Sequence, residues 1–263
     1  MTEIDKEPDT FSNTERSDLS SFELPVSMDS SPFLNWDDAE EPRSELEHAV
    51  VFRSLVATLK MHHALDESFE TKAVAFLEYV DPQDSESADD FLHSLGRTSG
   101  NSSPDFVQSI GVIISSTSQA IIGTTMKMLI TLFGSLSVTS LLALIQADLI
   151  TQIIDTLNPL SFSFVEAEDI HVYLLKILDY SLILATPYYL TRLGIEDDRK
   201  QQAVHETILK RVFVPSEKYM WHLCVNNFSI VDGDLSFQFR NLLTRILEIW
   251  KGCNKQFKYK AYT

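Results

Sequence analysis

The sequence predicts an all-α protein of short, stacked helices, and three observations carry this prediction. From residue 105 to 180 nearly every third or fourth residue is apolar, and the interruptions fall at Ser, Asp, Asn and Pro. Glycine is scarce, with 8 among 263 residues, whereas strand-rich folds need glycine in their hairpin turns. No stretch sustains the period-two alternation of a half-buried strand, so we expect no sheet.

The first 42 residues differ in character from the rest of the chain. They hold 12 acidic residues against Lys6 and Arg16, are rich in serine and show little periodicity. Such a segment buries too little apolar area to offset its ordering entropy, so residues 1–42 are predicted to be a disordered acidic arm. Within it, Phe33 and Trp36 in SPFLNWDDAEE are either anchors for a partner protein or side chains that pack onto the chain's own first helices. The second interpretation is preferred for Trp36.

Residues 43–96 are predicted to form an N-terminal helical hairpin region. Ser44 and Glu47 have the spacing of a capping box, so the first helix should begin at Ser44. A second apolar face covers residues 65–80 and stops at an Asp-Pro pair. A short third helix is expected over residues 87–95, where a glycine ends it.

Residues 104–250 are predicted to form armadillo-like helical repeats. Pro104 suits the first position of a short helix, and a longer apolar helix follows over 121–133. The same short-then-long order returns later, and 105–110 resembles 148–153 at a spacing of 43 residues (148 − 105). This spacing is close to the armadillo and HEAT repeat length.

The C-terminal part continues the helical pattern. A helix with an inner face over 204–212 is expected to end before Pro215, which should open a further helix. The last helix is predicted over 235–250. Residues 251–263 contain four lysines and no acidic residue, and we expect them to be a solvated basic tail.

One stretch is similar to an armadillo repeat. In LLALIQADLITQIIDTLNP, residues 144–147 resemble the end of the first helix of such a repeat, and 149–157 resemble the second. Asp148 stands where that family often has glycine. The resemblance therefore implies two short helices joined by a bend.

Over residues 30–250 the chain also resembles a large family of uncharacterised armadillo-type proteins from oxymonad flagellates. The stretches that carry this are SPFLNWDDAE, AVVFRSLVATLK, KAVAFLEYVDPQDSESADDFL, SPDFVQSIGVIISS and VPSEKYMWHLCVNNFSIVDGD. The resemblance implies an α-solenoid without an assigned activity. Relatives continue with further helices past Trp250, so we expect a shortened member whose last unit lacks a cap.

Motifs that carry chemistry are missing from the sequence. There is no phosphate-binding glycine loop, no HExxH and no G-x-S-x-G elbow. His222 and Cys224 have no second His or Cys pair at zinc-finger spacing. We therefore predict no catalytic residue, no metal site and no cofactor, and expect a protein that is not an enzyme.

The charge distribution argues for a protein partner. Of the formal net charge of −17, residues 1–100 carry −16, so no basic face is concentrated enough for nucleic acid. We expect a scaffold that binds an unknown protein. The sequence does not indicate the oligomeric state. Besides Phe33 and Trp36, the candidate partner-binding residues are charges on the long helices that would line a concave face: Lys127, Lys176, Arg240 and Arg245.

A membrane-associated helical protein is the alternative function. Residues 128–147 carry no charge and are long enough to cross a bilayer. Their polar residues gather in the middle, at GSLSVTS, where a turn between two helices would place them, so we do not expect a membrane span. The acidic N-terminus lacks a signal-peptide pattern and the chain has two cysteines, which together predict a cytoplasmic location.

Overall fold

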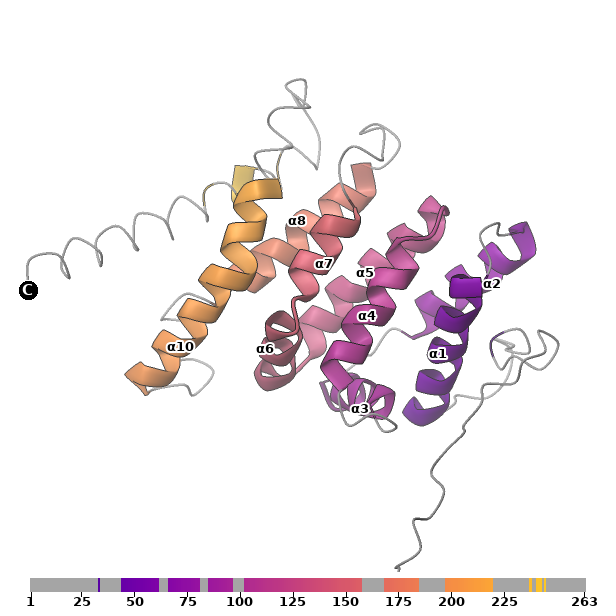
Figure 1. Ribbon diagram of the computed structural model, residues 1–263, viewed down its shortest axis with the longest axis horizontal. Helices are drawn as coiled ribbons and strands as arrows, with labels where there is room; N and C mark the ends of the chain where they lie inside the picture. The colour runs from indigo at the N-terminus through magenta and orange to yellow at the C-terminus, as the bar shows by residue number, and fades with distance from the viewer. Residues whose placement is uncertain are drawn as a thin grey trace, which may run out of the picture.

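The computed structural model describes residues 33, 44–61, 66–80, 85–96, 102–157, 168–184 and 197–219, together with 237, 240–242 and 244. Every regular element in this part of the chain is helical (Figure 1), which confirms the all-α prediction. The elements are α1 (Glu45–Met61), α2 (Glu67–Tyr79), α3 (Ser85–Leu95), α4 (Ser102–Ile114), α5 (Gln119–Ser135), α6 (Val138–Gln146), α7 (Leu149–Thr156), α8 (Glu168–Ile183), α10 (Asp198–Ile208) and the π-helix η2 (Leu209–Phe213). Apart from Phe33, the predicted disordered arm lies outside the described residues, as does the basic tail.

The predicted capping box at the start of α1 is confirmed. The backbone N–H of Ser44 donates to Glu47 Oε2 over 2.9 Å, and the N–H of Glu47 donates to Ser44 Oγ over 3.4 Å. These bonds satisfy two of the donors that a helix start leaves without an intrahelical acceptor.

Two other predicted helix starts are wrong by about two residues. α3 begins at Ser85 instead of residue 87, and Glu86 in its first turn complements the positive end of the helix dipole. α4 begins at Ser102, so Pro104 occupies its third position instead of its first. Proline is tolerated there because the first four backbone N–H groups of a helix have no intrahelical acceptor to lose.

Pro215 does not open a new helix, which corrects a further prediction. The chain stays helical from α10 through η2 and on through residues 214–219. At the end of η2 the N–H of Val214 donates to the carbonyl of Leu209, five residues earlier. This wider turn makes room for a proline ring that would otherwise meet the carbonyl four residues before it. Ser216 Oγ then donates to the Val212 carbonyl over 2.6 Å.

The predicted bend before Leu149 is present. α6 ends at Gln146 and α7 begins at Leu149, and the two helices meet at an angle of 54°. Asp148 turns the chain with a left-handed backbone, at a φ of 68°. This is the conformation that glycine adopts most readily, so Asp148 provides a sharp turn that is usually left to glycine.

The helices contact one another in two layers with a period of three. One layer runs α1, α4, α7 and η2, each contacting the next, and the other runs α2, α5 and α8. α3 and α6 both pack against α4. Figure 1 shows α1 and α2 at one end of the long axis, α10 towards the other, and the helices α3 to α8 between them.

A single hydrophobic core runs through the described residues, from Phe33 to Leu242. The ring of Phe52 on α1 stacks on Phe106 of α4 at a centroid distance of 6.1 Å, and it meets Phe91 of α3 edge-on at 5.6 Å. The core is therefore continuous across the sequence boundary predicted between the N-terminal hairpin region and the repeats.

The uncharged segment 128–147 is divided between two helices. α5 ends at Ser135 and α6 begins at Val138, so the break falls within the polar stretch as expected. Among the described helices, none alone has the length and apolar composition needed to cross a bilayer. By length and composition only, α6 and α7 together meet that requirement as a bent pair.

Candidate functional site: a groove across α1, α4 and α7

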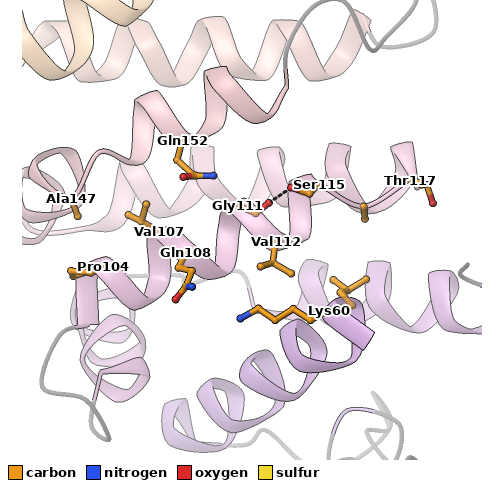
Figure 2. A pocket seen from close by; sticks show the side chains of 12 residues that line it. Lys60, Pro104, Val107, Gln108, Gly111, Val112, Ser115, Thr117, Ala147 and Gln152 are labelled. Carbon is orange, nitrogen blue, oxygen red and sulfur yellow. Dashed lines mark hydrogen bonds between the residues drawn. The ribbon is translucent and has the colours of Figure 1, made fainter. Parts of the chain in front are cut away.

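An open groove of about 600 Å³ lies along α4, with α1 on one side and α7 on the other. Figure 2 shows Lys60 reaching from α1 towards α4, and Gln152 lying over Gly111 from α7. The groove therefore crosses three successive members of one layer. Its lining residues are Leu59, Lys60, Pro104, Val107, Gln108, Gly111, Val112, Ser115, Ser116, Thr117, Ala147 and Gln152.

α4 supplies the floor of the groove along its whole length. Pro104, Gln108, Gly111 and Ser115 recur at intervals of three or four residues, which places them on one helix face. The other face carries Phe106, Ile110 and Ile113, which are fully buried in the core. Burial of that apolar face sets the rotation of α4 and so aims the polar face into the groove.

Gly111 brings α4 and α7 close together at the centre of the groove. A Cβ atom at this buried position would lie 2.6 Å from Gln152 Nε2 and 3.0 Å from its Cδ. Only glycine leaves the space in which the Gln152 side chain now lies. The wall on the α7 side therefore depends on a residue of α4.

Two hydrogen bonds orient Gln152. Its Nε2 donates to Thr156 Oγ1 over 3.1 Å, and that hydroxyl donates to the Gln152 carbonyl over 2.7 Å. Gln152 itself is exposed. The carboxamide is thus held from one side while it faces solvent in the groove.

The groove is lined by polar and apolar residues together and carries one positive charge. Lys60 is exposed and is the only charged side chain among the residues that line the groove. Near the α4–α5 turn, the buried Ser116 Oγ has no hydrogen-bond partner among the described residues. The exposed Lys60 ammonium favours a ligand that brings hydrogen-bond acceptors of its own.

The lining residues offer hydroxyl and carboxamide groups and one ammonium group. They include no carboxylate, histidine or cysteine, so the hydroxyls of Ser115, Ser116 and Thr117 have no neighbouring general base within the set. The carboxamides of Gln108 and Gln152 can each donate and accept hydrogen bonds, as a peptide backbone does. Lys60 adds attraction for a carboxylate.

The basic residues predicted from the sequence lie away from this groove. Lys127 on α5 approaches Glu78 of α2 at 3.9 Å, and Lys176 on α8 lies 5.8 Å from the ring centroid of Tyr173 on the same helix. Both belong to the layer of α2, α5 and α8. Arg240 is exposed. The side chains of Arg245 and Trp36 lie outside the described residues.

Phe33 is covered by its own chain. It is 0 % exposed, and its ring meets Phe69 and Phe76 of α2 at centroid distances of 5.2 and 6.2 Å. Its backbone N–H donates to Ser54 Oγ on α1 over 3.3 Å. In this structure Phe33 is therefore not available as a surface anchor for a partner. Packing onto the chain's own first helices, which was the interpretation preferred for Trp36, is thus observed for Phe33.

A second polar feature is a buried pair that joins α8 to the helical residues 214–219. His171 Nδ1 and the Tyr219 hydroxyl are 2.5 Å apart and their rings stack at 6.1 Å, with both residues 1 % exposed. Burial lowers the pKa of His171 from 6.5 to about 4 and raises the pKa of Tyr219. Because neither residue lies in the groove, we treat the pair as a contact that joins α8 to the helical residues 214–219.

Sequence reasoning missed the residues that form the groove. Lys60, Gln108 and Gln152 belong to three helices that are far apart in the chain. One local signal was present, since Gln108 and Ser115 share a face of α4 with Gly111 and leave it free of large apolar side chains. That signal does not say which neighbouring helices will flank the face.

No family model matches this chain, and neither a curated protein nor a solved structure is significantly similar to it. Nor do three or more His, Cys, Asp or Glu side chains gather as a metal site anywhere in the described part of the chain.

Proposed function

We propose that the protein is a non-enzymatic, armadillo-like α-solenoid scaffold that binds an extended segment of a partner protein in the groove across α1, α4 and α7. The observation that carries this proposal is the groove itself, with carboxamides from two helices and a lysine from a third facing one open channel. We further propose that the chain acts in the cytoplasm, as its composition suggests.

The period-three contact order supports the solenoid part of the proposal. α4 contacts α1 and α7, α5 contacts α2 and α8, and α7 contacts η2. In a solenoid each repeat contacts only its neighbours, so equivalent helices stack in layers. The left-handed residue between α6 and α7 supports an armadillo-type bend in the same unit.

The chemistry of the groove supports a peptide as the ligand. An extended strand exposes one N–H and one C=O per residue, and each carboxamide can pair with both. Lys60 favours a segment that carries a carboxylate at that point.

A selection from a random peptide display library against the full chain tests the proposal. The dissociation constants of the selected peptides are then measured for the wild type and for K60E and Q108A. We expect each substitution to weaken binding by about tenfold, which corresponds to about 1.4 kcal/mol. K200E is the matched control, because Lys200 is an exposed lysine on α10 outside the groove.

Two results would contradict the proposal. In the first, the library yields no peptide that binds the folded chain. In the second, the selected peptides bind K60E and Q108A as tightly as they bind K200E. If K127E or K176E instead abolished binding, the partner site would be the layer of α2, α5 and α8 that the sequence predicted.

A further inference from the structure

A socket between α1 and α2 holds a residue that comes from neither helix. Ser54 of α1 and Phe69 and Phe76 of α2 form its polar and aromatic sides, and Phe33 fills it. The two ring contacts are edge-on, with interplanar angles of 62° and 75°. Edge-on contacts are the favourable geometry for aromatic pairs, so the socket is shaped for an aromatic side chain.

The backbone hydrogen bond gives the socket a second point of recognition beside the rings. The N–H of Phe33 reaches Ser54 Oγ while its ring points towards α2. A ligand must therefore present a free backbone N–H and an aromatic ring from the same residue. The Ser54 hydroxyl thus recognises the backbone N–H of the ligand, and the phenylalanine rings recognise its aromatic side chain.

The socket lies at the exposed end of the helical stack. Among the described helices, none precedes α1 in its layer or α2 in its layer (Figure 1). Leu46, Val50 and Ser54 recur every four residues along one face of α1, and Leu46 and Val50 are 41 % and 38 % exposed. Apolar surface at the end of a repeat stack calls for a capping element.

We propose that this socket is a binding site for an aromatic residue that presents its ring and its backbone N–H together, and that Phe33 of the same chain is an exchangeable occupant of it. Removing the Phe33 side chain vacates the socket. The vacant socket then accepts the segment that contains Phe33 when it is supplied as a separate peptide.

A peptide-binding measurement on full-length chains tests this assignment. The probe is a fluorescent peptide of residues 27–41, SMDSSPFLNWDDAEE. We expect the F33A chain to bind it at least about tenfold more tightly than the wild-type chain, whose socket is already filled. The same peptide with Ala in place of Phe33 should not bind the F33A chain. F237A is the matched control chain, because Phe237 is 57 % exposed, and it should behave as the wild type does.

Three results would overturn the proposal. The folded F33A chain could fail to bind the peptide, or bind the alanine-substituted peptide equally well, or bind no more tightly than the wild type does. If F33A does not fold, F33L keeps an apolar side chain in the socket and should still bind the peptide more tightly than the wild type. Light scattering on the wild type adds one more check, since a dimer with exchanged arms would contradict occupation by the same chain.

Discussion

Asp148 combines a strained backbone with an ion pair that crosses to a later helix. It is the only non-glycine residue with a positive φ among those described, and its carboxylate pairs with the guanidinium of Arg211 on η2. The left-handed conformation costs an ordinary L-residue about 1–2 kcal/mol, less for Asp than for most. The pair is partly exposed, so we expect it to contribute about 0–1 kcal/mol.

Two substitutions at this position separate the strain from the ion pair. D148G loses the pair but relieves the strain, so its free energy of unfolding should stay within about 1 kcal/mol of the wild type. D148A loses the pair and keeps the strain, and it should be about 1–2 kcal/mol less stable than D148G. Urea unfolding followed by circular dichroism measures both. Equal stability of the two variants would mean that the bend does not require a left-handed residue.

Buried His171 predicts a loss of stability in mild acid. Its folded pKa is about 4, against 6.5 for an unperturbed histidine. Between these values the unfolded chain takes up a proton that the folded chain does not, so stability falls as the pH falls from about 6.5 to about 4. From pH 7 to pH 5 we expect His171 to account for a loss of about 2 kcal/mol.

The comparison of H171Q with the wild type isolates this contribution. The variant is expected to be less stable at pH 7, because the Tyr219 hydroxyl loses its present partner, but to lose less stability on going to pH 5. H93Q, at an exposed histidine of α3, should keep the wild-type pH dependence. An H171Q chain with the same loss as the wild type between pH 7 and pH 5 would place the acid sensitivity elsewhere.

At the scale of single elements, the start of α5 depends on one buried cap. Ser118 is buried, and its Oγ accepts the backbone N–H of Ile121 over 3.1 Å. S118A should therefore cost about 1–2 kcal/mol of unfolding free energy, whereas S118T keeps the acceptor. S109A is the control, because that hydroxyl only donates back to the Asp105 carbonyl within α4. The cap would be unimportant if S118A and S109A had the same stability.

Most elements follow from local patterns, and the exceptions have local physical reasons. The apolar periodicity and the Ser44 capping box predicted the helices and the start of α1, because both depend on residues within one or two turns. The prediction that Pro215 opens a new helix was wrong because a π-turn accommodates its ring within a continuous helix. Proline alone does not indicate such a turn. The prediction for Pro104 was wrong because the first helical turn tolerates proline at several positions.

At the scale of the whole molecule, ion pairs join helices from different parts of the stack. Glu78 and Lys127 link α2 to α5, Asp148 and Arg211 link the start of α7 to η2, and Asp155 approaches Lys218 at 3.8 Å. These pairs follow the order of contacts within each layer.

The groove could not be predicted because it exists only in the assembled stack. Its width depends on how closely α4 approaches α7, and that distance is set by the missing side chain of Gly111 and the position of Gln152. The partner-binding residues predicted from the sequence were charges on the long helices. Two of them, Lys127 and Lys176, lie in the layer of α2, α5 and α8 instead of the groove. Core packing over many residues determines which helix faces contact one another, and no single sequence motif predicts it.

The affinity of a selected peptide for G111A and for G134A tests most directly whether the groove is the partner site. At Gly111 a Cβ displaces the flexible Gln152 side chain, whereas at Gly134 it meets no atom within 4 Å. Both variants should fold, with unfolding free energies within about 1 kcal/mol of the wild type. We expect G111A to bind the peptide about tenfold more weakly and G134A to bind it as the wild type does. Equal affinity of G111A and G134A would contradict a partner site in this groove.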